Sequence, residues 1–209
     1  SARAGDNLGM HIKYSAENKG MKKTAGLVAT NSTRNGNEGS ICRVQTNVRL
    51  MRAVGIMAHG GHDDLEVVEV PEVHAGVGQV RIRVYAAAVN PTDTLARDGT
   101  RAAQQAVDPP PYVPGMDCAG VVDEVGDGVT TGAAVGDRVM AMVIPKGAHG
   151  AYREQIVLDQ MAVVPAPAGT SHVEACTLPM NALTARLSLN LLGLTAGDML
   201  AVTGAAGAY

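Results

Sequence analysis

A turn rich in glycine and alanine near the end of the sequence has the residue types that bind phosphate groups. An apolar run at 199–202 leads into the letters TGAAGAY at 203–209. When such a turn joins a strand to a helix, its small residues let backbone N–H groups approach a pyrophosphate. We therefore predict a cofactor-binding turn formed by Ala206, Gly207, Ala208 and Tyr209.

Metal ligands are poorly represented in comparison. The three cysteines, Cys42, Cys118 and Cys176, have no CxxC spacing, and the histidines show no ligand spacing. Because zinc sites are built from clustered thiolate, imidazole and carboxylate groups, we predict no metal site. Dispersed cysteines in odd number also give no disulfide framework, and we interpret Cys118 and Cys176 as small buried apolar residues.

Composition restricts the partners of the protein. The net charge of −3 disfavours a broad nucleic-acid-binding surface. No apolar run approaches the roughly 20 residues of a membrane helix, and no signal peptide is evident. We expect a cytoplasmic protein with neither nucleic acid nor a membrane as a partner.

Residues 1–50 differ from the rest of the sequence. They hold eight of the 17 Lys and Arg residues but only three of the 20 Asp and Glu residues, and they show no sustained hydrophobic period. Such a segment cannot bury enough apolar surface to offset its chain entropy, so we expect it to be disordered or a non-native extension. A nucleic-acid-binding arm is the alternative, but the basic residues are scattered and lack aromatic neighbours.

Short strands dominate the sequence from residue 51 onward. In GQVRIRV at 78–84, Val80, Ile82 and Val84 alternate with polar residues, which is typical of a half-buried strand. Further short apolar runs bounded by Gly or Pro follow, up to MAVVPAP at 161–167. This spacing predicts a β-barrel or a β-sandwich.

Helical patterns begin after residue 170. Ser171 is a candidate N-cap because Glu174 follows three residues later, which is the spacing of a capping box. We expect Pro179 to interrupt the pattern and a second helix to run from 181 to 192, ending at Gly193. The apolar run at 199–202 then predicts one more strand.

Several ordered motifs resemble the medium-chain dehydrogenase/reductase superfamily, and within it the quinone oxidoreductase (zeta-crystallin-like) branch. The resemblance covers about 51–209 and is carried by the stretches 86–99, 113–129, 150–169 and 178–189, together with the last turn. It implies a mainly β fold in which a GroES-like, partly open β-barrel is followed by two helices and the first strand of a truncated Rossmann (α/β) domain. The barrel domain would occupy 51–178, and the NAD(P)-binding domain would begin at 179–209.

The resemblance also implies chemistry without zinc. Zinc-dependent members of the superfamily have a Cys where this chain has Asn90, and a His-Glu pair where it has Met116 and Asp117. Amide and thioether groups are poor zinc ligands. NADPH would instead deliver a hydride to a quinone or an α,β-unsaturated carbonyl, which needs little activation. The choice of NADP over NAD comes from the resemblance alone, and no catalytic residue is assigned.

Four residues upstream of the turn are implied to line the nicotinamide cleft, namely Asn90, Met180, Asn181 and Thr184. Two of them have local alternatives. Asn90 could cap the turn before Pro91, and the Thr184 hydroxyl could bond to the backbone of its own helix.

The sequence stops within the predicted nucleotide-binding turn. We therefore expect this chain to be an inactive fragment without useful affinity for NADPH, and its parent to be a homodimeric oxidoreductase. Residues 199–202 are expected to be poorly ordered, to aggregate or to pair with another copy, because a lone strand exposes unpaired backbone groups. Two other interpretations are a non-catalytic GroES-like barrel module and a relative of zinc-type alcohol dehydrogenases.

Overall fold

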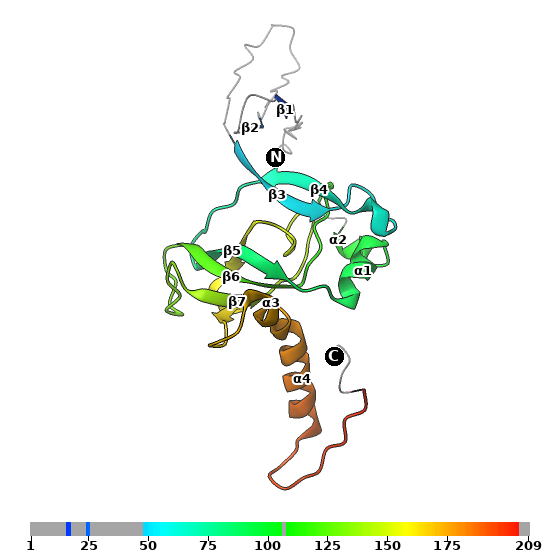
Figure 1. Cartoon of the computed structure of the whole chain (residues 1–209), viewed down its shortest axis with the longest axis vertical. Coiled ribbons are helices and arrows are strands. Elements are labelled where there is room, and N and C mark those ends of the chain that lie inside the picture. Colours follow the sequence, from blue (N-terminus) through cyan, green and yellow to red (C-terminus); the bar gives the residue numbers. More distant parts are fainter. Residues whose placement is uncertain (1–15, 18–23, 26–47, 106–107, 205–209) are drawn as a thin grey trace, which may run out of the picture. The chain divides into compact units, whose positions relative to one another are not determined.

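Figure 1 shows the computed structural model, which describes residues 16–17, 24–25, 48–105 and 108–204. The chain divides into two compact units, Ser1–Leu50 and Met51–Tyr209. In the first unit, β1 (Ala16–Glu17) pairs antiparallel with β2 (Thr24–Ala25), and β2 pairs with the first residues of β3 (Val48–Gly55). Most of residues 1–50 lie outside the described ranges. The expectation that this segment is disordered or a non-native extension therefore stays a prediction.

An antiparallel sheet of five strands forms the centre of the second unit, in the order β8-β5-β6-β7-β9; its middle strands β5, β6 and β7 are labelled in Figure 1. The alternation predicted around residue 80 is confirmed, because Val80 and Ile82 are completely buried while Arg83 is exposed. Irregular pairing between β5 and β6 at two points helps the sheet to curl into a half-barrel. The strands are β5 (Gln79–Ala87), β6 (Asp117–Val125), β7 (Arg138–Met142), β8 (Gln155–Asp159) and β9 (Val163–Pro165).

The main core lies among these strands and is built mostly from branched aliphatic side chains. The sequence contains no Phe or Trp, so Ile82, Val122 and Ile156 fill the interior. Gly120 permits the close approach of β5 and β6, because a Cβ atom there would lie 2.0 Å from the backbone oxygen of Arg83. Real contacts at that distance do not occur, so the position requires glycine.

Smaller elements surround the sheet. A second apolar cluster packs β3 and β4 (Glu66–Pro71) against the loop that contains Val113. Two short helices, α1 (Pro91–Arg97) and α2 (Ala102–Gln105), follow β5, and the 3-10 turns η1 (His62–Asp64) and η2 (Gln160–Ala162) lie elsewhere in the chain. Within the part of the chain that the structure describes, no helix is long and apolar enough to cross a membrane.

The two helices predicted after residue 170 are present. At the start of α3 (His172–Ala175), the Ser171 hydroxyl accepts a hydrogen bond from the Glu174 N–H at 3.2 Å, and the Glu174 carboxylate accepts one from the Ser171 N–H at 2.8 Å. The capping box is therefore confirmed.

The expected effect of Pro179 was wrong. It lies in the first turn of α4 (Leu178–Leu192) rather than interrupting the helix. A first-turn proline is tolerated because its missing N–H would have no partner within the helix. The predicted end at Gly193 is confirmed by the left-handed backbone of this residue, with φ of 62°.

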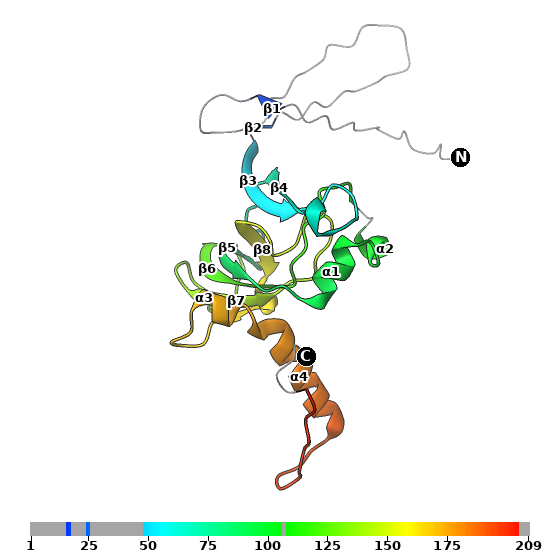
Figure 2. The ribbon, with the colours of Figure 1, turned by 45° about the vertical axis from the view of Figure 1, so that its right-hand side comes forward.

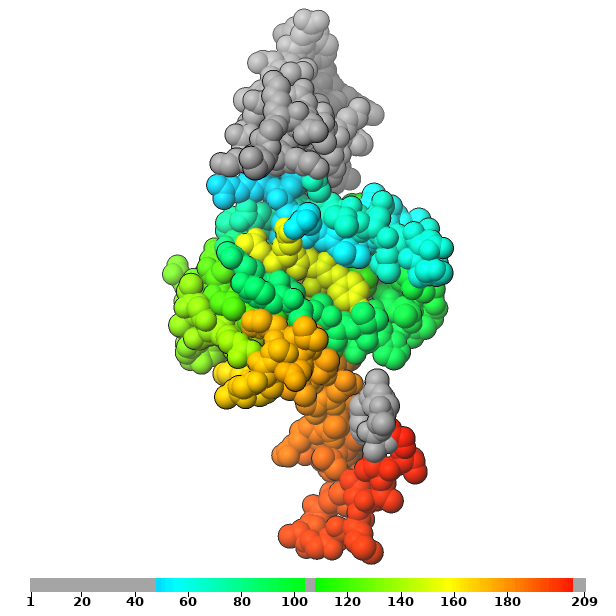
Figure 3. Space-filling view, in the orientation of Figure 1, coloured from blue at the N-terminus to red at the C-terminus, as the bar shows by residue number. Residues whose placement is uncertain are grey.

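Only the beginning of α4 lies against the sheet, near β6 and β7, and the rest of the helix extends away from it (Figures 2 and 3). None of its residues is buried. The strand predicted at 199–202 is not formed, and Met199 is 98% exposed. A ladder needs a neighbouring strand, and no strand in the described ranges pairs with this segment.

Candidate functional site

Asn90 lies at the junction between β5 and α1, where its local sequence fixes its backbone. It is the N-cap of α1, Pro91 follows it in the first turn, and the Asp93 carboxylate accepts a hydrogen bond from the Asn90 backbone N–H at 2.8 Å. An acidic residue three positions after an N-cap commonly makes this reciprocal bond. Asn90 is only 8% exposed. Asn90 thus caps the turn before Pro91, which is the local role that the sequence offered as an alternative. The contact of Asn90 with a cofactor stays a prediction.

The Asn90 side chain is held by a residue of the sheet. Its amide nitrogen Nδ2 donates to Oδ2 of Asp117 at 2.9 Å. Asp117 begins β6 and is completely buried, and its other oxygen, Oδ1, accepts a hydrogen bond from the backbone N–H of Met180 at 2.9 Å. Burial raises the pKa of Asp117, and these two hydrogen bonds oppose that increase.

A second buried carboxylate, Asp93, supports the same junction. Its Oδ1 accepts from the Gly115 N–H at 2.9 Å, and its Oδ2 accepts from the Tyr152 hydroxyl at 3.1 Å. Burial and the neighbouring Asp93 charge raise the pKa of Tyr152, which keeps the phenol neutral. We call the buried Asn90, Asp93 and Asp117, together with the half-buried Tyr152, the buried polar junction.

Sequence reasoning identified only one member of the buried polar junction as functional. The spacing of Asn90 and Asp93 was the available signal, because it is the spacing of a capping pair. No comparable local pattern pointed to Tyr152. Asp117 was considered only as a position where zinc-dependent relatives carry a different acid.

The other predicted cofactor residues divide into three groups. Met180 is brought to Asn90 through their shared partner, Asp117. Asn181 and Thr184 instead bond within their own helix region: Asn181 Nδ2 donates to the Thr177 carbonyl at 3.0 Å, and the Thr184 hydroxyl donates to the Met180 carbonyl at 2.8 Å. The predicted turn, Ala206 to Tyr209, lies outside the described residues.

The donor atoms at this junction do not fit a zinc ion. Asn90 turns its amide nitrogen toward Asp117, and the Met116 sulfur accepts a hydrogen bond from the Thr92 hydroxyl at 2.6 Å. One carboxylate beside an amide and a thioether is not a zinc ligand set. No group of three or more His, Cys, Asp or Glu side chains suited to a metal occurs in the described residues.

The two cysteines within the described residues behave as small apolar residues. Cys118 and Cys176 are 0% and 3% exposed, respectively, which confirms the interpretation from the sequence. Burial raises the pKa of Cys118 to about 12, so its thiol stays protonated and is a poor nucleophile.

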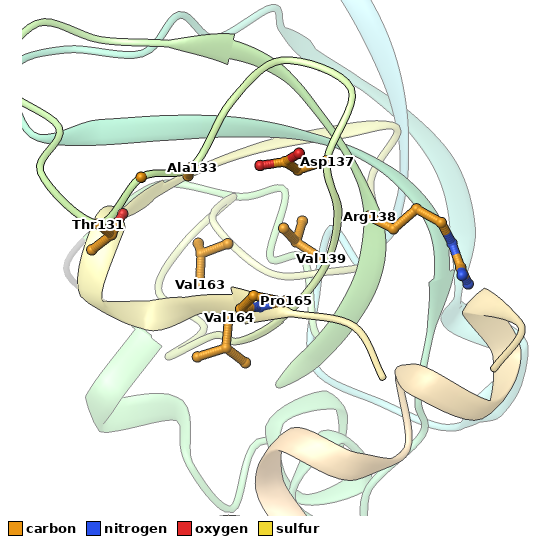
Figure 4. Close-up of a pocket in the computed structure, with 9 residues that line it drawn as sticks. Thr131, Ala133, Asp137, Arg138, Val139, Val163, Val164 and Pro165 are labelled. Atoms are coloured by element: carbon orange, nitrogen blue, oxygen red, sulfur yellow. The ribbon is translucent and has the colours of Figure 1, made fainter. Parts of the chain in front are cut away.

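A cavity of about 260 Å³ lies between β7, β9 and the loop before β7 (Figure 4). The two charged residues on its wall form hydrogen bonds with backbone groups of the protein. Asp137 accepts from the Ala134 N–H at 2.8 Å, and Arg138 donates to the Thr170 carbonyl, with its side chain directed away from the cavity. The cavity lies near Arg138, whereas Asp117 pairs with Met142 at the opposite end of β7. The cavity is therefore separate from the buried polar junction.

Comparison with known proteins identifies the domain. The alcohol dehydrogenase GroES-like domain matches residues 76–168. Quinone oxidoreductase of Rattus norvegicus is 33% identical over 168 residues, which covers 78% of this chain and 48% of the rat protein. This chain thus spans about half the length of the quinone oxidoreductases of rat and mouse.

Solved structures show the same likeness. The quinone oxidoreductase from Coxiella burnetii is 28% identical with a TM-score of 0.64, over 71% of this chain and 47% of its own. An NAD-dependent alcohol dehydrogenase is 34% identical with a TM-score of 0.61, over 71% of this chain and 49% of its own. These matches confirm the predicted GroES-like half-barrel followed by helices, and the chain belongs to the medium-chain dehydrogenase/reductase superfamily.

Proposed function

We propose that this chain supplies the substrate-side barrel of a zinc-independent, NADPH-dependent oxidoreductase that acts on quinones or α,β-unsaturated carbonyls. The observation that carries the proposal is the donor set at Asn90, Met116 and Asp117, which does not fit zinc, in a chain similar to quinone oxidoreductases. Without a Lewis acid, a simple ketone is hard to polarise, whereas a quinone spreads the charge that it receives onto its oxygens.

The buried polar junction has one feature that supports a role at the nicotinamide end of such a site. Asn90 and the first turn of α4, which are far apart in the sequence, meet at one carboxylate. When bound, NADPH supplies a hydride. The residues of this chain hold the Asn90 amide in a fixed orientation, and the neutral Tyr152 phenol adds no charge beside it. A fixed, largely dry environment of this kind aligns donor and acceptor without reorganisation during the reaction.

The test uses the complete product of the gene that encodes this chain. We expect oxidation of NADPH in the presence of a quinone or an enone, and less than stoichiometric zinc by elemental analysis of the purified protein. Alcohols with NAD serve as the control substrates, and they should give no comparable rate. Failure of NADPH titration to quench or enhance cofactor fluorescence would refute the proposal.

A zinc-type alcohol dehydrogenase is the second candidate, and the similarity to an NAD-dependent alcohol dehydrogenase favours it. It requires about one zinc per chain and NAD-dependent oxidation of an alcohol, both removed by a chelator. The same elemental analysis and substrate panel therefore separate the two candidates.

A further inference from the structure

One buried carboxylate joins two segments that are distant in the sequence. Asp117 contacts Asn90, 27 residues away, through one oxygen, and Met180, 63 residues away, through the other. The residue is 0% exposed, so water cannot replace either partner without opening the structure. Both oxygens are therefore committed to holding protein groups in place.

The chemistry of the two partners explains why the residue is an acid. The Asn90 amide nitrogen and the Met180 backbone N–H are both donors. A carboxylate can accept at each of its oxygens, whereas a carboxamide has one accepting end and one donating end. Asparagine at position 117 would keep the shape but place its NH₂ against one of the two donors, leaving that donor unsatisfied.

The orientation of Asn90 is fixed at two points. Asp93 binds its backbone N–H and Asp117 binds its side chain. Asp93 also binds the N–H of Gly115, two residues before Asp117, so both carboxylates act on the same short stretch of chain. Movement at Asp117 would consequently be passed to Asn90 and to the beginning of α4.

We propose that Asp117 is a positioning residue, which fixes the Asn90 amide and the first turn of α4 in the single arrangement that binds the nicotinamide end of the cofactor. The cofactor part of this inference rests on the proposed function. Asp117 touches neither cofactor nor substrate in this scheme and acts only through the two groups that it holds.

The first experiment compares D117N with V122A in the complete gene product. Val122 lies on the same strand, is also completely buried, and belongs to the apolar core rather than to the junction. We expect D117N to raise the KM for NADPH about tenfold, with a smaller change in kcat, on the scale of one lost hydrogen bond. V122A should lower the Tm without changing that KM. An unchanged KM in D117N with a similar loss of Tm would reduce Asp117 to a structural role and overturn the proposal.

D117N places an amide in a closed site, so a folding defect in that variant could obscure the result. N90A is therefore tested beside it, because N90A removes the donor of the same hydrogen bond. N90A should raise the KM for NADPH by a similar factor, and the effect of the double variant should be smaller than the sum of the two single effects, because both single variants break the bond between Asn90 and Asp117. Fully additive effects would contradict a shared link.

The second experiment uses the 209-residue chain and does not depend on catalysis. In D117N, we expect the Asn90 side-chain NH₂ resonances to move toward solvent-exposed values, and the Met180 amide to exchange its hydrogen at least about tenfold faster. V122A should leave the Asn90 resonances in place. A complete, wild-type gene product that fails to bind NADPH would overturn the proposed function, whereas an unchanged Asn90 resonance and Met180 exchange rate in the D117N variant of the 209-residue chain would overturn the link itself.

Discussion

The sheet and α4 differ in how they use similar apolar side chains. In the sheet, Val80, Ile82 and Ile156 are completely buried. In α4, Leu187 and Leu191 are 53% and 88% exposed, and no residue of the helix is buried. The two regions meet at Asp117, whose hydrogen bond to Met180 links the start of the helix to the first residue of β6.

The difference shows that apolar content alone does not give burial. Each strand of the sheet has neighbours that supply both hydrogen bonds and apolar contacts, so the hydrophobic gain accumulates in one cluster. Beyond its first turns, α4 packs against little of the described chain, and its stability comes from local features such as its proline start and glycine end. Substitutions should therefore have large effects in the sheet and small effects in the helix.

The largest effect is expected for I82A in the core of the sheet. Removal of a completely buried isoleucine side chain should lower the free energy of unfolding by about 2–5 kcal/mol. L187A on α4 is the matched control, and it should change the free energy by less than about 0.5 kcal/mol, because its side chain is half exposed. Urea unfolding followed by circular dichroism measures both. Equal losses would show that α4 is packed in solution.

The next largest effect is expected for G120A. The added Cβ would lie 2.0 Å from the Arg83 carbonyl oxygen, so β5 and β6 would have to separate, at a cost of about 1–3 kcal/mol. G61A introduces the same methyl group where its nearest neighbour is 3.8 Å away, and it should be close to neutral. A stable G120A variant would show that β5 and β6 do not approach each other this closely at Gly120.

A smaller effect is expected for S171A, which removes the N-cap of α3. Loss of the hydrogen bond from the Glu174 N–H should cost about 1 kcal/mol of unfolding free energy. S188A, within α4, is the control; alanine is the better helix former there, so no loss is expected. Thermal unfolding of the two variants and the wild type measures both changes. An unchanged stability of S171A would show that the Ser171 hydroxyl does not stabilise α3.

The smallest effect is a pH dependence of the same cap. The hydrogen bond from the Ser171 backbone holds the pKa of Glu174 below its ordinary value of 4.5. A depressed pKa in the folded state means that the contribution is present above that ordinary value and is lost as the pH falls through the folded-state pKa. The stability advantage of the wild type over E174Q should accordingly shrink below about pH 4.5. An advantage that stays constant down to pH 3 would contradict this assignment.

Local features of the structure were predictable from the sequence because a few adjacent residues determine them. The alternation of Val80 and Ile82, the capping pair of Ser171 and Glu174, and the helix end at Gly193 all appear as expected. The error at Pro179 was also local, since proline is compatible with a first turn and incompatible with a helix interior. The strand expected at 199–202 depended instead on a neighbouring strand, which a local pattern cannot supply.

The buried polar junction was predictable only in part. Of its four members, only Asn90 was identified from the sequence, through a family resemblance and as a possible cap of the turn before Pro91. The role of Asp117 could not be inferred in this way, because its two partners lie 27 and 63 residues away. Similarly, the contact between Tyr152 and Asp93 spans 59 residues.

The sequence by itself determined the strand period around residue 80, the cap at Ser171 and the helix end at Gly193, because each depends on residue type and short spacing. Only the tertiary structure decided that Asn90 and the start of α4 share one carboxylate, and that the leucines of α4 beyond its first turn remain exposed. The physical reason is the same in both cases: a buried donor needs an acceptor and an apolar face needs a partner, and folding, rather than local pattern, determines which distant residues supply them.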